Sequence, residues 1–287
     1  CLFSSRSDRA RERQGVSRLK SGIRFLVRAL ADFLFPPICY GCDDETESGL
    51  VCDSCRLLLF TSELDVCPVC GRPCRDAAAT CGRCAVPLPL ARVRALGSYG
   101  QPFAGLVHAL KYDRKTSLAP LLGQALALLA WQDSELKACD AVCAVPLHPA
   151  RRRERGYNQA ELLAEVVAQE TGMPFESWLV RRKNTPTQTA RHDDEARRRN
   201  LKGAFALRSG AIVQGKRILL VDDVMTSGAT LGAAAEPLLE AGAGGVCGLV
   251  IAAASAPAPR ANRGQLRIWR RKRASPARRG AGRVAAD

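Results

Sequence analysis

The chain has 287 residues, of which 47% are hydrophobic, and a formal net charge of +15 at pH 7. Residues 1–35 carry 8 basic and 3 acidic side chains, and residues 260–287 carry 10 and 1, so the middle of the chain is close to neutral. The hydrophobic fraction is enough for a buried core, and the charged residues that interrupt every candidate apolar run exclude a membrane span. We expect a soluble, cytoplasmic protein of roughly two domains.

Residues 1–36 are expected to form a basic leader. Between Val16 and Phe35 the hydrophobic residues recur at helical spacing with basic side chains opposite them, which predicts an amphipathic helix packed on the protein's own core rather than on a membrane or nucleic acid. The chain begins with Cys1 instead of Met, which indicates a fragment or a misassigned start. The leader is far too short for a glutaminase domain with Cys1 as its nucleophile.

Four C-x-x-C pairs follow within residues 37–90. Each pair can direct two thiolates at one ion, so the four pairs predict two closed, structural zinc sites of four thiolates each. Sequential pairing of the C-x-x-C motifs is expected, interleaved pairing stays open, and a disulfide module or an iron–sulfur site is the competing interpretation. Cys74 is expected to be a bystander. The predicted ligands are Cys39, Cys42, Cys52, Cys55, Cys67, Cys70, Cys81 and Cys84.

From Ala91 the pattern changes to alternating strands and helices. We expect strands at Val93–Tyr99 and Asp140–Leu147, and helices at Phe103–Tyr112 and Ser117–Trp131. The second strand leads into an arginine-rich segment, predicted to be a loop, and then into a helix that begins near Asn158. Arginine side chains pair well with phosphate oxygens, so this loop is a candidate diphosphate site. Its candidate residues are Arg151, Arg155, Gly156 and Asn158.

Residues Arg181–Phe205 have almost no hydrophobic periodicity. They predict a long mobile loop, and long loops in compact domains are commonly functional lids. Gln188 and Arg197 are the candidate ligand-contacting residues of this lid.

The most informative stretch is Arg217–Leu231, which reads RILLVDDVMTSGATL. Its continuous apolar run predicts a parallel strand buried on both faces, with Asp222 and Asp223 at the carboxyl end. A loop with Thr226, Ser227, Gly228, Ala229 and Thr230 then precedes a helix expected at Gly232–Leu239, whose free N–H groups favour a phosphate. Carboxylates beside such a loop can bind sugar hydroxyls or Mg²⁺. The stretch therefore predicts a phosphorylated-sugar site, and the absence of a G-x-x-x-x-G-K-[ST] motif argues against a P-loop NTPase.

This stretch resembles the phosphoribosyl diphosphate (PRPP) motif of type I phosphoribosyltransferases. The resemblance implies that Asp222 and Asp223 hold the ribose hydroxyls and that residues 226–230 hold the 5′-phosphate. Over roughly residues 34–253 the chain resembles the ComF/GntX family, which joins a double zinc ribbon to a phosphoribosyltransferase-like domain. The resemblance rests on LFPPICYGC, Leu110-Lys111-Tyr112, Arg155-Gly156-Tyr157-Asn158-Gln159, Thr185–Gln188, Arg197–Asn200, Gly203-Ala204-Phe205 and the two aspartates.

The resemblance implies an α/β, type I phosphoribosyltransferase fold, mostly parallel and flanked by helices, at residues 91–255, followed by a basic tail at 256–287 that is expected to be disordered. It also implies Mg²⁺-dependent transfer of phosphoribose from PRPP to an unknown acceptor, and a link to DNA uptake and competence proteins. The alternative is a non-catalytic adaptor that senses PRPP or binds single-stranded DNA. Because the ends hold the excess charge, any such DNA binding is expected to come mainly from them.

Overall fold

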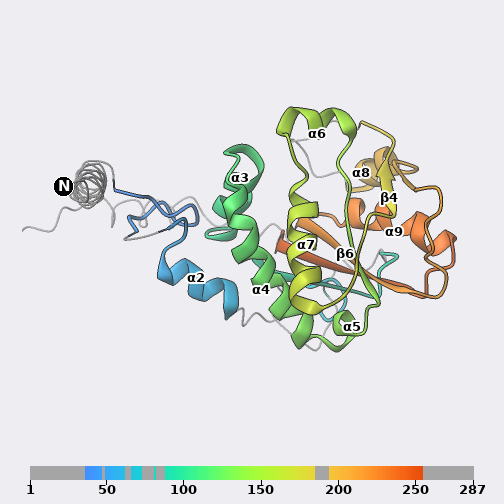
Figure 1. The fold of residues 1–287 in the computed structure, drawn as a ribbon, viewed down its shortest axis with the longest axis horizontal. Coiled ribbons are helices and arrows are strands. Elements are labelled where there is room, and N and C mark those ends of the chain that lie inside the picture. The colour runs from blue at the N-terminus through green and yellow to red at the C-terminus, as the bar shows by residue number, and fades with distance from the viewer. Residues whose placement is uncertain are drawn as a thin grey trace, which may run out of the picture. The chain divides into compact units, whose positions relative to one another are not determined.

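The computed structural model describes residues 36–46, 49–61, 66–72, 81, 88–184 and 194–254, without the side chains of residues 194–197 (Figure 1). Several sequence predictions therefore lie outside the described residues. They are the amphipathic helix of the leader, Cys1, Cys74, Cys84, Gln188, the side chain of Arg197 and the tail at 256–287. No helix in the described part of the chain has the length and hydrophobicity needed to cross a membrane.

A five-stranded parallel sheet forms the centre of the fold, in the order β1-β7-β6-β2-β3. The central strand, β6, carries the apolar run that the sequence predicted, and this run is fully buried. Leu219 and Val221 pack into the core on one face, whereas Ile218 and Leu220 pack into the core on the other. The predicted α/β fold class is thereby confirmed. The strands are β1 Arg92–Ser98, β2 Ala141–Ala144, β3 Phe175–Glu176, β6 Arg217–Met225 and β7 Gly245–Ala253.

Helices cover both faces of this sheet (Figure 1). On one face α4 and α7 pack against each other, with Leu122, Leu126, Leu163 and Val167 in the core. On the other face α9 packs against β6 and β7, and its inward residues include Leu231 and Leu238. The helices of the α/β domain are α3 Phe103–Tyr112, the 3-10 turn η2 Thr116–Leu118, α4 Ala119–Gln132, α5 Ser134–Lys137, α6 Pro149–Arg155, α7 Gln159–Thr171, α8 Asp194–Leu201 and α9 Ala229–Glu240.

The prediction of an arginine-rich loop after β2 was wrong, because this segment is the helix α6. Pro149 occupies its first turn, His148 caps it by accepting a hydrogen bond from the Ala150 amide at 3.2 Å, and Gly156 ends it with a φ of 91°. Proline at the start and glycine after the end are typical helix boundaries. No residue of α6 is buried, so hydrophobic periodicity could not reveal the helix.

The prediction of an unstructured lid over residues 181–205 was also wrong in part. The antiparallel strands β4, Leu179–Arg181, and β5, Phe205–Leu207, pair across this segment, and α8 lies between them in the sequence. Helix α8 is strongly polar, and among its described side chains Leu201, at its last position, lies in the core. The sequence of this helix carries no hydrophobic stripe, which explains why the sequence pattern missed it.

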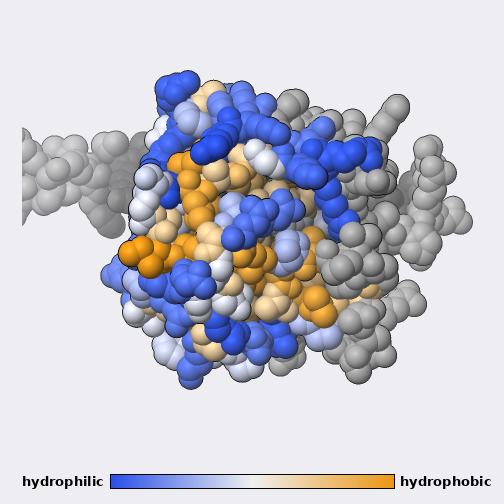
Figure 2. All heavy atoms as spheres, turned by 90° about the vertical axis from the view of Figure 1, so that its right-hand side faces the viewer, coloured by the Kyte–Doolittle hydropathy of each residue, from blue (hydrophilic) through white to orange (hydrophobic). Residues whose placement is uncertain are grey.

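The cysteine-rich region packs against the same cores. Helix α2, Asp53–Phe60, contacts α4, and Cys39, Val51, Cys55 and Leu59 belong to the core on the α4 side of the sheet. Cys67 and Cys70 belong to the core on the α9 side. The described surface is mixed: on the side shown in Figure 2, exposed hydrophobic side chains lie in the middle of the face and a band of hydrophilic ones lies above them.

Candidate functional site

The two aspartates lie within β6, which continues past them to Met225, and not beyond the end of the strand as the sequence suggested. Asp222 is still in register with Val250 of β7. Both side chains are nearly inaccessible, with exposed fractions of 8% for Asp222 and 4% for Asp223. Buried carboxylates are costly unless they are paired, so their partners define the site.

Asp223 is held by two side chains from different helices. Lys111, near the end of α3, places Nζ 2.6 Å from Oδ1, and Gln159, the first residue of α7, donates from Nε2 to Oδ2 at 2.5 Å. Arg155 in turn donates to the Gln159 side chain. Burial alone would lower the pKa of Lys111, but the negative charges of Asp223 and Asp222 outweigh it and raise that pKa. Asp223 is therefore paired with a charged ammonium.

Asp222 has a weaker set of partners. It accepts a hydrogen bond from the Asp223 amide at 2.8 Å. Burial, followed by the charge of Asp223, raises the pKa of Asp222 to about 7, and Lys111, the Asp223 amide and Arg181 offset this only in part. The buried Asp222 carboxyl therefore holds its proton more strongly than an exposed aspartate does.

The predicted phosphate loop connects β6 to α9. The helix begins at Ala229, three residues earlier than predicted, so Ala229 and Thr230 belong to its first turn. Gly228 precedes it with a φ of 84°, a left-handed conformation that glycine adopts without strain. Ser227 is buried and its Oγ accepts a hydrogen bond from the Ala229 amide at 3.3 Å. The first turn of α9 presents N–H groups without acceptors inside the helix, which is the arrangement that binds anions.

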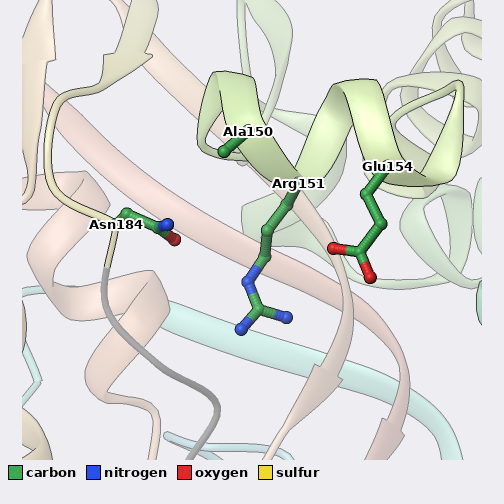
Figure 3. Close-up of a pocket in the computed structure, with 4 residues that line it drawn as sticks. All are labelled: Ala150, Arg151, Glu154 and Asn184. Carbon is green, nitrogen blue, oxygen red and sulfur yellow. The ribbon is translucent and has the colours of Figure 1, made fainter.

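Helix α6 lies across from the end of β4 and contributes positive charge. Arg151 extends from α6 into a cavity of about 220 Å³ that is also lined by Ala150, Glu154 and Asn184 (Figure 3). Burial lowers the pKa of Arg181, and the charge of Arg151 does the same, whereas Asp222 acts in the opposite direction. Arg181 therefore interacts electrostatically with Asp222, and Arg151 lies close enough to interact with Arg181.

The other predicted residues of this segment have more local roles. Asn158 is buried, caps α7 by accepting from the Ala160 amide at 3.1 Å, and donates to the Val145 carbonyl at 3.1 Å. Gly156 ends α6. Arg155 reaches the carboxylates only through Gln159. The structure thus brings together Asp222, Asp223 and the phosphate loop, with Arg151 and Arg155 nearby.

The first cysteine cluster has the geometry of a zinc site. The Sγ atoms of Cys39, Cys42, Cys52 and Cys55 all lie within 4.8 Å of one another, which agrees with sequential pairing of the first two motifs. Cys42 and Cys52 are separated by 3.7 Å between sulfurs, and a tetrahedral site with Zn–S bonds of about 2.3 Å would require about 3.8 Å. These thiols therefore fit a zinc ion.

Backbone amides in the same cluster favour the thiolate form. The amides of Gly41 and Cys52 donate to Cys39 Sγ at 3.3 and 3.2 Å. Burial would raise the pKa of Cys39, but these hydrogen bonds and one from the Cys42 amide lower it to about 7. Because zinc binds the thiolate, the backbone around Cys39 favours the form that the metal requires, whereas burial and the neighbouring thiols raise the pKa of Cys55.

The second cluster contains Cys67, Cys70 and Cys81, and the predicted fourth ligand Cys84 lies outside the described residues. Cys70 and Cys81 are 3.3 Å apart between sulfurs, and the Cys81 amide donates to Cys67 Sγ at 3.4 Å. The four cysteines of the first cluster form no disulfide in the described part of the chain. The cysteine clusters thus support zinc over a disulfide module.

Sequence reasoning did not assign Lys111, Gln159 and Arg181 to the site. Lys111 and Gln159 occur in segments that carry the family resemblance, but neither has a pattern of its own that indicates contact with an aspartate. Asp223 is 64 positions away from Gln159, so only the packing of α7 against β6 reveals the pair.

Comparison with protein families gives two matches. The double zinc ribbon domain family matches residues 30–85, and the phosphoribosyl transferase domain family matches residues 158–268. DNA utilization protein YhgH of Salmonella typhimurium is 35% identical over 198 residues, which cover 67% of this chain and 86% of that protein. Competence protein F of Haemophilus influenzae is 32% identical over 191 residues, which cover 64% of this chain and 82% of that protein.

Among solved structures, the chain is similar to a glutamine PRPP amidotransferase from B. subtilis complexed with ADP and GMP. That similarity has a TM-score of 0.32 and 26% identity, and covers 46% of this chain and 26% of the other.

Proposed function

The chain belongs to the ComF/YhgH family, whose members join a double zinc ribbon to a phosphoribosyltransferase-like domain and are linked to DNA utilization and competence, and we propose that it binds PRPP and transfers phosphoribose. The observation that carries this proposal is the arrangement around the end of β6. Two buried carboxylates are followed, three residues later, by a glycine-containing loop that opens into the helix N-terminus of α9. Ribose hydroxyls and a 5′-phosphate need these two kinds of partner side by side.

In this proposal Asp222 and Asp223 bind the ribose hydroxyls, and residues 226–230 bind the 5′-phosphate through backbone N–H groups and hydroxyls. The carboxylate oxygens are also suitable ligands for Mg²⁺, which prefers oxygen and binds with substrate phosphates. When bound, Mg²⁺ would neutralise charge on the diphosphate.

Lys111 has a specific part in the proposed reaction. In the structure it and Gln159 occupy both carboxylate oxygens of Asp223. Ribose hydroxyls that hydrogen-bond to Asp223 must share or replace these contacts, which frees the ammonium of Lys111 for another anion. The leaving diphosphate is that anion in our proposal.

The proposed transfer reaction separates charge, and the site must stabilise both charges in the transition state. Breaking the bond between C1 and the diphosphate develops positive charge on the ribose and negative charge on the leaving group. Arg151 and Lys111 would stabilise the leaving group, and the carboxylates would stabilise the ribose. The segment at 181–205, with Gln188 and Arg197, stays the predicted lid that excludes water.

Calorimetry with PRPP and Mg²⁺ tests the binding step. The wild-type protein should bind PRPP, whereas Asp222→Ala with Asp223→Ala should lose at least about a hundredfold in affinity, because two hydrogen-bonding charged groups are removed. The matched control is Glu236→Ala with Glu240→Ala, which removes two exposed carboxylates from α9. A folded Asp222/Asp223 variant with unchanged affinity would contradict the assignment.

The second candidate function is a non-catalytic adaptor that senses PRPP or binds single-stranded DNA. The names of the relatives favour a role with DNA, and Arg152 and Arg153 are exposed on α6. A diphosphate-release assay across nucleobases separates the two candidates. Release that depends on one acceptor supports the transferase, and PRPP binding without release supports the adaptor.

A further inference from the structure

Arg72 is a buried cation beside the proposed phosphate loop. Its exposed fraction is 3%, and among the described residues no ion pair is formed by this guanidinium. Nη2 donates to the Thr226 carbonyl at 2.8 Å, while Nε is buried without a hydrogen-bond partner in the described structure. A buried charge without a counter-charge is unfavourable, so this arrangement points to an anion that completes it.

The second cysteine cluster fixes the position of Arg72. The Arg72 carbonyl accepts a hydrogen bond from the Cys67 amide at 2.8 Å, and the Cys67 carbonyl accepts one from the Gly71 amide at 3.0 Å. The same turn lies directly on β1, because a Cβ atom on Gly71 would be 2.5 Å from the Val93 carbonyl oxygen. The turn that holds two predicted zinc ligands therefore also holds Arg72 against the loop.

The chain that follows the second cluster contacts the loop as well. A Cβ atom on Gly228 would lie 2.7 Å from the side chain of Leu88, so this packing leaves no room for a larger residue. Ser227 between these contacts is buried. The phosphate loop is consequently shaped by the cysteine-rich region as well as by β6 and α9.

We propose that Arg72 belongs to the 5′-phosphate site and that the second zinc site positions it there. The ligand class is the phosphomonoester of a sugar phosphate, and the inference rests on the proposed binding of PRPP. The guanidinium would supply positive charge to the phosphate and hold the loop in place through the Thr226 carbonyl. The amides of the first turn of α9 would add their hydrogen bonds to the same phosphate.

The test compares three ligands that contain different parts of PRPP. They are PRPP with Mg²⁺, ribose 5-phosphate, and inorganic diphosphate with Mg²⁺. Arg72→Met should weaken PRPP and ribose 5-phosphate about tenfold or more, as expected for loss of a hydrogen bond to a charged group. Binding of diphosphate, which lacks the 5′-phosphate, should stay unchanged. Arg72→Lys should recover part of the affinity because it keeps the charge.

Arg94→Met is the matched control. Arg94 donates to the Pro68 carbonyl at 3.2 Å and pairs with Asp133 at 2.8 Å, so it also joins the second cluster to the α/β domain. Among the described residues, its side chain makes no contact with the phosphate loop. This variant should lose stability without selective loss of ribose 5-phosphate binding. Zinc content and thermal midpoint are measured for every variant.

A measurement on the wild-type protein keeps the proposal testable even where Arg72→Met does not fold. The NMR signal of the Arg72 Nε–H group, assigned with Arg72→Lys, should shift on addition of ribose 5-phosphate and stay in place with diphosphate. The proposal is overturned if folded Arg72→Met binds all three ligands as tightly as the wild-type protein does, or if it binds all three more weakly by the same factor. It is also overturned if the Nε–H signal does not move. Failure of the wild-type protein to bind PRPP would instead overturn the proposed function.

Discussion

The cysteine-rich region and the α/β domain are stabilised in different ways. In the α/β domain, leucine, valine and isoleucine side chains fill a core on each face of the sheet. Among the described residues of the cysteine-rich region, the buried side chains include four predicted zinc ligands, Cys39, Cys55, Cys67 and Cys70, and a few aliphatic ones such as Leu59. We therefore expect one region to depend mainly on buried apolar area and the other mainly on metal coordination.

The two regions also contribute different residues to the proposed site. The α/β domain supplies the carboxylates and the phosphate loop, whereas the cysteine-rich region supplies Arg72. A region without a large core of its own can place a side chain only while its metal is bound. The comparison therefore predicts that metal loss and core mutations have distinguishable effects.

Zinc removal should have the largest effect. The wild-type protein should contain about two zinc ions per chain, and Cys39→Ser should contain about one, because one of four thiolate ligands is lost. Structural zinc contributes about 10–16 kcal/mol to the folding of isolated zinc fingers, so amides at residues 36–60 should lose protection from hydrogen exchange. The amides of β6 should stay protected.

Cys143→Ser is the matched control for this experiment. Cys143 lies in β2, is buried in the core on the α9 side of the sheet, and belongs to neither cysteine cluster. It should leave the zinc content unchanged. Iron with visible absorbance, or disulfides that account for the eight paired cysteines, would contradict the zinc assignment.

Features that depend on neighbouring residues in the sequence could be predicted in both regions. The spacing within a C-x-x-C motif is local, and the first four cysteines indeed form one cluster. The apolar run at 218–221 is long enough to indicate a strand buried on both faces, as the structure confirms. Both signals depend on residues that are close together in the sequence.

The remaining features depend on contacts between distant residues or on helices without an apolar face. Arg72 and Thr226 are 154 positions apart, so no local pattern indicates their hydrogen bond. Lys111 reaches Asp223 only because α3 ends beside the carboxyl end of β6. Helices α6 and α8 are polar, and their boundaries follow from capping and from burial at one end rather than from periodicity.

Ionisation of Asp222 should affect the α/β domain by a smaller amount. Its pKa is raised from 3.8 to about 7, so between these values the folded state binds more protons than the unfolded state. Stability must then fall as the pH rises through this window. Asp222→Asn removes the ionisable group, so its stability relative to the wild-type protein should increase from pH 5 to pH 8.

Urea midpoints of both proteins across this pH range provide the measurement. If protonation of the zinc-binding cysteines releases zinc at low pH, it does so in both proteins, so its effect on stability cancels in the difference between them. Glu236→Gln, at an exposed position of α9, should run parallel to the wild-type protein. A similar parallel curve for Asp222→Asn would show that burial does not raise the pKa of Asp222.

The smallest effect on the fold, and a selective one on DNA binding, should come from removal of the basic chain ends. Residues 1–35 and 260–287 hold most of the net charge of +15. A protein shortened to residues 36–259 should keep its zinc content, because all eight predicted ligands lie within it. If single-stranded DNA binds through the ends, the affinity of the full chain should fall steeply with salt, by a logarithmic slope of about 0.7 for each phosphate contacted.

The shortened protein should bind more weakly and with a shallower slope, since aromatic stacking contributes little in a chain with 5% aromatic residues. Equal affinity and equal slope would instead place the DNA-binding surface on the zinc ribbons or the α/β domain, where the exposed arginines of α6 are the first candidates to substitute.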